Sequence, residues 1–76
     1  MFVHAGALRP GDLLDAVGVM MWLEDHAGTE FTESDWVYAE SELFEVESTE
    51  FEGDNVIIYT DYMNFTVPIE NPVVIN

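Results

Sequence analysis

Short β-prone segments separated by strong turn signals constrain the fold of this chain more than any other feature. Val56–Thr60 (VIIYT) is rich in β-branched and aromatic residues and follows Glu52–Asn55 (EGDN), which is typical of a tight turn. Because both faces of this segment are apolar, we expect it to be a central strand. Val73–Ile75 predicts a terminal strand, and Phe65–Val67 predicts either a further short strand or the entry to a tight turn.

A longer alternating pattern covers residues 37–48, where apolar or small residues take turns with acids. Such alternation is typical of a strand with one wet face. The alternation changes phase at Leu43–Phe44, and a slip of one residue would put every later side chain on the wrong face of the sheet. A β-bulge or sharp bend at that point restores the facing. We therefore expect a bent strand whose outer face carries four glutamates, Glu40, Glu42, Glu45 and Glu47.

Residues 13–23 leave two interpretations open. A strand interrupted at Gly18 is favoured, because glycine weakens a helix by roughly 1 kcal/mol and a Pro-Gly-Asp turn precedes the segment. The alternative is a helix that is capped by Asp12 and ends near Gly28. The polar, glycine-containing residues 24–35 predict a loop.

Four to five short strands, one of them bent, indicate an all-β fold in which a small barrel of SH3-like or OB-like type closes on itself. Closure would also protect the edges of the sheet from pairing with other chains. A length of 76 residues leaves room for one domain, so we expect residues 1–76 to form a single small acidic β domain. The absence of cysteine excludes disulfides and thiolate chemistry.

Charge limits the partners that the chain can take. Sixteen Asp and Glu residues face one basic residue, Arg9, and the formal net charge is −15. Direct contact with nucleic-acid phosphate or anionic lipid is therefore disfavoured, whereas cations and basic protein surfaces are favoured. The longest apolar run, Val17–Leu23, is far shorter than the roughly 20 residues of a membrane helix, and the N-terminus lacks a signal-peptide pattern. We expect a cytoplasmic protein without a membrane partner.

The order of the short segments resembles that of small acidic uncharacterised proteins encoded by phages of actinobacteria. The likeness covers most of residues 7–75 and rests on a rhythm of segments, namely Gly11–Asp15 (GDLLD), Tyr38–Glu40 (YAE), Phe44–Glu47 (FEVE), Val56–Tyr59 (VIIY), Val67–Pro68 and Val73–Ile75. What the resemblance implies is a phage origin, a small β-barrel and, for such a protein, the cytoplasm of the host. It carries over no functional residue.

The residue types argue against catalysis. The chain has no Cys, no Lys and one Arg, its serines lack a G-x-S-x-G setting, and no Gly-rich phosphate loop occurs. We therefore predict no enzyme, no catalytic residue and no cofactor. His26 lies among several acids that could attract a hard cation, but their spacing does not match the EF-hand pattern. The prediction is a solvated acidic loop without a metal site, and loose cation binding there stays open.

Two functions from different classes fit these features. The first is a non-enzymatic interaction domain that binds a basic surface of a host protein through the charged strip, with Trp22 or Trp36 as an apolar anchor. Nucleic-acid mimicry would be its sharpest form. It needs several acidic strips or a dimer, because same-face strand positions lie about 7 Å apart while duplex DNA carries one charge per roughly 1.7 Å. The alternative is a structural module that self-associates into a homo-oligomer and uses its acids only for solubility.

Overall fold

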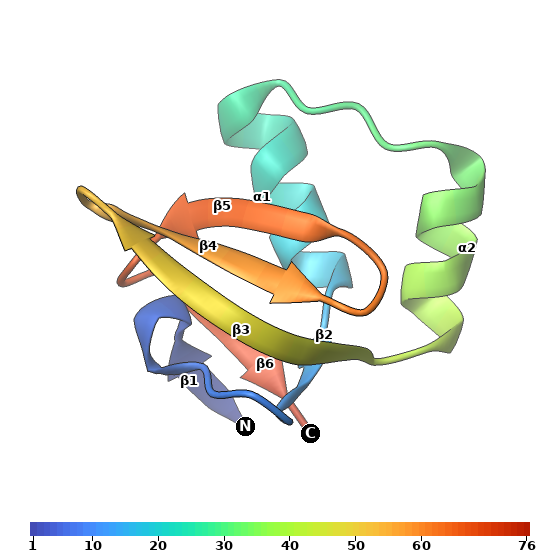
Figure 1. Cartoon of the computed structure of the whole chain (residues 1–76). Helices are drawn as coiled ribbons and strands as arrows, with labels where there is room; N and C mark the ends of the chain where they lie inside the picture. The colour runs from blue at the N-terminus through green and yellow to red at the C-terminus, as the bar shows by residue number, and fades with distance from the viewer.

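The computed structural model describes all 76 residues as one antiparallel sheet with two helices inserted between its second and third strands (Figure 1). The sheet has the order β1-β6-β2-β3-β4-β5. Its strands are β1 (Phe2–His4), β2 (Leu13–Asp15), β3 (Phe44–Glu52), β4 (Asn55–Thr60), β5 (Asn64–Pro68) and β6 (Pro72–Ile75). The helical segments are the 3-10 turn η1 (Ala5–Ala7), α1 (Val17–Ala27) and α2 (Glu33–Ser41).

The fold is mostly β, but the expectation of an all-β fold is wrong because the chain also forms two α-helices. The best-marked strands lie where the sequence predicts them. Val56–Thr60 falls within β4, which is central because it pairs with β3 on one side and β5 on the other. Gly53 supplies the turn between β3 and β4 with a positive φ of 61°. Phe65–Val67 is a strand rather than a turn entry, and Val73–Ile75 belongs to β6. The sheet has six strands in all, one more than the upper expectation.

The strand favoured for residues 13–23 is confirmed for its first three residues only and is wrong from Val17 onward, where the alternative, a helix, is found. Leu13–Asp15 forms a strand, and a helix begins at Val17. Its cap is not Asp12, because the carboxylate that accepts a hydrogen bond from the Val17 N–H belongs to Asp15, at 3.2 Å. The helix continues to Ala27 and ends at Gly28, whose φ of 66° lies in the left-handed region. A loop over residues 24–35 is therefore wrong at both ends, since α2 begins at residue 33.

The strand predicted over residues 37–43 is wrong, because residues 37–41 belong to the helix α2, Glu42 is its C-terminal cap and Leu43 only links it to β3. A capping box starts the helix: the Asp35 N–H donates to Thr32 Oγ1, and the Thr32 N–H donates to Asp35 Oδ2, each at 3.1 Å. These two bonds satisfy backbone donors that would otherwise be unpaired at the helix start. The cap thus favours a helix over the strand that the alternating pattern of residues 37–43 predicts.

The expected phase slip exists, but it is at a different place. The pairing of β3 with β4 shifts between Val46 and Ser48, so Glu47 is the extra residue of a β-bulge, and Leu43–Phe44 is only the entry to the strand. Before the bulge, Val46 is buried and Glu45 is exposed. After it, even-numbered residues take the outer positions.

The core lies between the curved sheet and the inner faces of the helices. Val19, Met20 and Leu23 project from α1 into it, and Phe44 stacks near Phe65 with ring centroids 6.0 Å apart. In Figure 1, α1 stands behind β4 and β5, and α2 lies beside the start of β3. Neither helix is long and apolar enough to cross a membrane.

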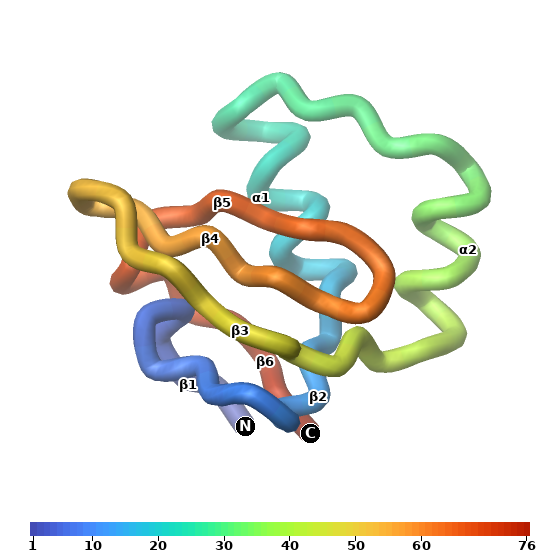
Figure 2. The backbone as a smooth tube through the Cα atoms, viewed as in Figure 1, coloured from blue at the N-terminus to red at the C-terminus, as the bar shows by residue number.

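The N-terminal segment ties the ends of the sheet together. The Ala5 N–H donates to the Asn71 carbonyl and the Gly6 N–H to the Ile69 carbonyl, both at 2.9 Å. Through these bonds η1 reaches the connection between β5 and β6. The two chain ends lie side by side (Figure 2), and the Met1 amino group donates to the Ile75 carbonyl at 3.0 Å.

Candidate functional site: an acidic surface

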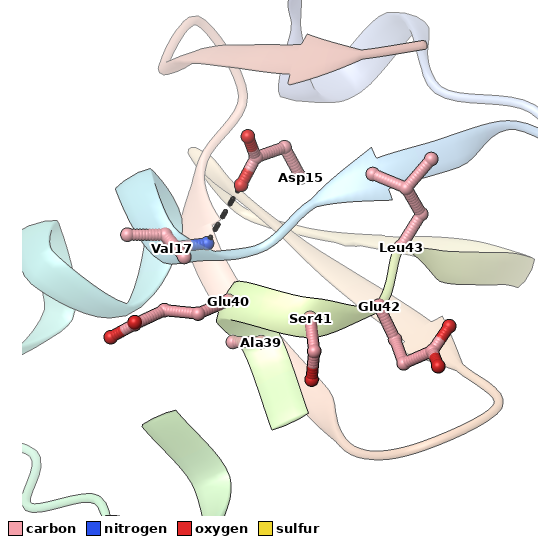
Figure 3. Close-up of a pocket in the computed structure, with 7 residues that line it drawn as sticks. All are labelled: Asp15, Val17, Ala39, Glu40, Ser41, Glu42 and Leu43. Atoms are coloured by element: carbon pink, nitrogen blue, oxygen red, sulfur yellow. Dashed lines mark hydrogen bonds between the residues drawn. The ribbon is translucent and has the colours of Figure 1, made fainter. Parts of the chain in front are cut away.

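A shallow acidic hollow lies where the end of α2 meets the junction of β2 and α1 (Figure 3). Its volume is about 450 Å³, and seven residues line it, Asp15, Val17, Ala39, Glu40, Ser41, Glu42 and Leu43. The sequence separates these two groups by more than twenty positions, and the fold brings them together. The hollow therefore places Asp15 beside Glu40 and Glu42, a proximity that no sequence pattern indicates.

The three carboxylates of the acidic hollow do not converge on one point. Figure 3 shows that Asp15 turns toward the start of α1, where it accepts the Val17 N–H, and that Glu40 and Glu42 point in different directions along the rim. Nowhere does the structure bring three His, Asp or Glu side chains together in a way that could hold a metal ion. This geometry suits contact with an extended basic surface better than capture of a single ion.

More acidic side chains lie on the outer face of β3, next to the acidic hollow. Glu45 lies opposite Leu13 of β2, and Glu50 and Glu52 lie opposite Ile57 and Asn55 of β4. Directly opposed residues share a face of the sheet, and both β4 neighbours point away from the buried Val56 and Ile58. The bulge at Glu47 therefore rephases β3 so that Glu50 and Glu52 join Glu45 on the outer side.

One hydrogen bond orders part of this face. The Tyr59 hydroxyl donates to Glu50 Oε1 at 2.9 Å. This bond, with desolvation and the charges of Glu50 and Glu52, raises the pKa of Tyr59 above its ordinary value of 10.0. The phenol thus stays protonated and holds the Glu50 carboxylate against the sheet.

The four predicted strip residues do not lie on one strand face, contrary to the expectation. Glu40 is in the last turn of α2, Glu42 is its C-terminal cap, and only Glu45 and Glu47 are in β3. All four are exposed, and they follow one another from the rim of the acidic hollow onto β3. We use the name acidic surface for these four together with three residues that the sequence did not single out, Asp15, Glu50 and Glu52.

The three missed residues differ in what could have revealed them. Glu50 and Glu52 continue the acidic alternation, but two residues instead of one separate Glu47 from Glu50. This change of phase could have been recognised in the sequence. Asp15 offers no such signal, because its place beside α2 depends on the tertiary fold alone.

Aspartates and glutamates have different uses in this chain. Four aspartates accept backbone N–H groups and shape turns and helix starts, namely Asp12, Asp15, Asp35 and Asp61. All ten glutamates are exposed. The glutamates therefore supply surface charge, whereas most of the aspartates serve the fold.

Both helices end with acids, which is electrostatically unfavourable. Glu40 occupies the last turn of α2 and Glu42 its cap, with no basic residue in that turn. The C-terminal end of a helix carries a partial negative charge, so each acid there costs about 0.3–1 kcal/mol when exposed. The last turn of α1 holds Glu24 and Asp25, with His26 as its one basic group. A cation from outside would relieve this repulsion.

The two tryptophans have different surroundings. Trp22 of α1 stacks on His26 with ring centroids 4.7 Å apart, and it lines a small hollow beside β6. Trp36 of α2 packs edge-to-face on Phe31 at 5.9 Å and against the core. Both are half-buried. The residues near His26 are largely helical and form no metal-binding group.

Comparison of the chain with protein-family models, with curated proteins and with solved structures finds no match.

Proposed function

We propose that this chain is a non-enzymatic interaction domain whose acidic surface binds a basic surface of another protein. The observation that carries the proposal is the acidic hollow, where Asp15, Glu40 and Glu42 meet the negative end of α2. The chain itself holds one basic side chain, Arg9, against sixteen acids. Such a negative charge speeds the encounter with a basic partner, and the positive charge of the bound partner reduces the repulsion among the acids.

The proposal extends to origin and setting. A phage-encoded protein in the cytoplasm of its bacterial host would meet many basic, nucleic-acid-binding proteins. The most specific form of the proposal is that the chain mimics nucleic acid. It is supported by the position of the acidic hollow next to the acidic face of β3, since mimicry needs several groups of acids side by side. We also propose that the curved sheet is a small barrel of SH3-like or OB-like type, supported by the η1 hydrogen bonds that link its ends.

A pair of charge-matched variants tests the function. One replaces Glu40, Glu42, Glu45 and Glu47 by Gln, and the control replaces Glu24, Glu30 and Glu33 by Gln and Asp25 by Asn. Each removes four charges, so both carry −15 + 4 = −11. Immobilised chains are exposed to nuclease-treated bacterial lysate at 10 mM and 150 mM NaCl.

The expected result is that the wild type and the control variant retain basic proteins at low salt and release them at high salt, while the first variant retains far less. Screening explains the release, because exposed charges interact over a Debye length that salt shortens. Equal retention by the two variants would contradict a role for the acidic surface, since net charge alone would then explain binding.

Self-association is the second candidate, and the edge strand β1 favours it. Met1 and Phe2 are 80% and 75% exposed at that edge. Exposed apolar residues at the free edge of a strand offer a surface for a second copy. Sedimentation velocity separates the two functions: a dimer that strengthens as salt rises supports self-association, whereas a monomer at all salt concentrations excludes it.

A further inference from the structure

A second, more apolar hollow lies on the other side of the β2–α1 junction. Phe2, Val74 and Asp15 are cross-strand neighbours, and they form a row over β1, β6 and β2. Gly18 and Trp22 of α1 stand beside this row, and the first residue of β6 closes one end. The space measures about 170 Å³. We call it the Trp22 hollow. It is smaller than the roughly 300 Å³ at which small-molecule pockets begin, so its size suits one side chain.

Gly18 keeps the Trp22 hollow open. A Cβ built on this glycine would have no atom within 4 Å, so the packing of the free chain does not require glycine there. Its φ is not positive, so the backbone does not require glycine either. Glycine in a helix interior nonetheless costs about 1 kcal/mol relative to alanine, and Gly18, in the first turn of α1, carries up to this cost. A glycine at this position would let another molecule come close to the helix backbone, and we take this as the reason for Gly18.

The walls of the Trp22 hollow suit an apolar side chain. The Trp22 ring is held by its stack on His26, which lies nearly parallel to it at an interplanar angle of 12°. Phe2 also lines the Trp22 hollow and is 75% exposed. A hollow lined by a fixed aromatic ring and an exposed apolar one is the kind of place where a single inserted side chain contributes much of the binding energy.

The surrounding charge indicates the occupant. Asp15 lines the Trp22 hollow and also the acidic hollow, where Glu40 and Glu42 lie. A second copy would bring another net charge of −15 to this place, whereas a basic segment would be attracted to it.

We propose that the Trp22 hollow receives an apolar side chain of a basic segment of a partner protein, with Lys or Arg residues on either side of it. This inference rests on the proposed function and names the partner's chemistry. The acidic surface attracts the segment, and the Trp22 hollow selects those segments that carry a large apolar residue among the basic ones.

Four labelled nonapeptides test this inference. Each carries four arginines and four serines in alternation around a central residue, which is Leu, Phe, Trp or, in the reference peptide, Ser. Fluorescence anisotropy at 10 mM NaCl, the salt concentration at which the acidic surface is expected to bind, measures their affinity for the wild type, for Gly18→Leu and for Met21→Leu. Met21 is exposed on the same helix but does not line the Trp22 hollow, so Met21→Leu is the matched control. Thermal unfolding verifies that each variant folds.

The expected result is that at least one apolar peptide binds the wild type and Met21→Leu about tenfold more tightly than the serine peptide, the gain expected from burial of one side chain. Gly18→Leu should abolish this gain and leave the affinity for the serine peptide unchanged. An amide shift at Gly18 and an indole shift at Trp22 on titration would locate the contact.

Three results would overturn the inference. If no apolar peptide gains over the serine peptide, the Trp22 hollow is not used, while binding of the serine peptide would still support the proposed function. If Gly18→Leu keeps the gain, the apolar residue binds elsewhere. If the same Gly18 and Trp22 shifts arise from self-association without peptide, the occupant is a second copy. Failure of every peptide to bind would overturn the proposed function as well.

Discussion

Gly6 is the one glycine of the chain at which a neighbouring side chain occupies the place of a Cβ. A Cβ on Gly6 would lie 2.6 Å from Ile69 Cγ2, and its N–H already donates to the Ile69 carbonyl. The Ile69 methyl group cannot move far, because its Cβ carries it directly. Glycine here is therefore a steric requirement of the bond between η1 and the β5–β6 connection.

We predict that Gly6→Ala lowers the free energy of unfolding by about 1–3 kcal/mol, as overpacking does elsewhere. Gly18→Ala is the control, because nothing lies near its Cβ, and it should stabilise the chain by up to about 1 kcal/mol through helix propensity. Urea unfolding of both variants measures the difference. A Gly6→Ala chain as stable as the wild type would show that η1 does not hold the sheet ends together.

Tyr62 and Asp35 join the β4–β5 loop to the start of α2. The Tyr62 hydroxyl donates to Asp35 Oδ1 at 2.7 Å, and its ring stacks on Tyr38 of α2 at 4.3 Å. The hydrogen bond from Tyr62, with those from Thr32, lowers the pKa of the Asp35 carboxyl below 3.8. The same bond raises the pKa of the Tyr62 phenol above 10.0.

We predict that the stability advantage of the wild type over Tyr62→Phe depends on pH. A carboxyl whose pKa is lowered by folding stabilises above its unfolded pKa and loses this contribution as pH falls through the folded value. The advantage should be complete at pH 7 and shrink below about pH 4. The raised Tyr62 pKa makes it disappear again as pH rises beyond 10. Urea unfolding of both chains from pH 2.5 to pH 7 tests this, and an advantage that is constant over this range would contradict it.

At the scale of single elements, α2 is where the sequence misleads. The apolar or small positions Val37, Ala39 and Ser41 alternate like those of a strand, and Val37 and Tyr38 remain more than a third exposed. The apolar face of the helix is narrow, with Trp36 and Ala39 against the core, and the cap and the Tyr38–Tyr62 stack add to what holds it. Periodicity measures burial, so it fails for an element with little to bury. The pattern Thr32-x-x-Asp35 was the usable signal.

We predict that Thr32→Ala lowers the free energy of unfolding by about 1 kcal/mol, because the N-cap oxygen that accepts the Asp35 N–H is lost. Thr32→Ser keeps this oxygen and should stay within a few tenths of a kcal/mol of the wild type. Hydrogen exchange of the first α2 amides should quicken in the alanine variant alone. Equal loss in both variants would mean that the Thr32 methyl group, not the cap, matters.

At the scale of the molecule, the parts that the sequence predicts are those where local preference and burial agree. β4 is both β-prone and alternately buried, and the closing strands β5 and β6 follow the same rule. The β-bulge at Glu47 could not be placed, because it is defined by how β3 pairs with β4. The exposure of Glu45 and Glu47 was predictable from alternation, whereas their union with Asp15 and α2 required the tertiary fold.

The net charge acts over the whole molecule at low salt. The principal extents of the chain are 30 × 26 × 19 Å. The Debye length is about 30 Å at 0.01 M and about 8 Å at 0.15 M ionic strength. At 0.01 M ionic strength each carboxylate therefore interacts with nearly all the others, and at 0.15 M it interacts only with its neighbours.

We predict that the free energy of unfolding rises when NaCl increases from 0.01 M to 0.15 M, because screening relieves repulsion that is greater in the folded chain than in the expanded one. The variant with Gln at positions 40, 42, 45 and 47 should rise less, since its net charge is −15 + 4 = −11. Potassium chloride should act like sodium chloride, because screening depends on ionic strength and not on the cation. Urea unfolding at each salt concentration measures the effect. A stability that does not change with salt would mean that the carboxylates repel one another no more in the folded chain than in the unfolded one, and a basic partner would then gain nothing by relieving that repulsion.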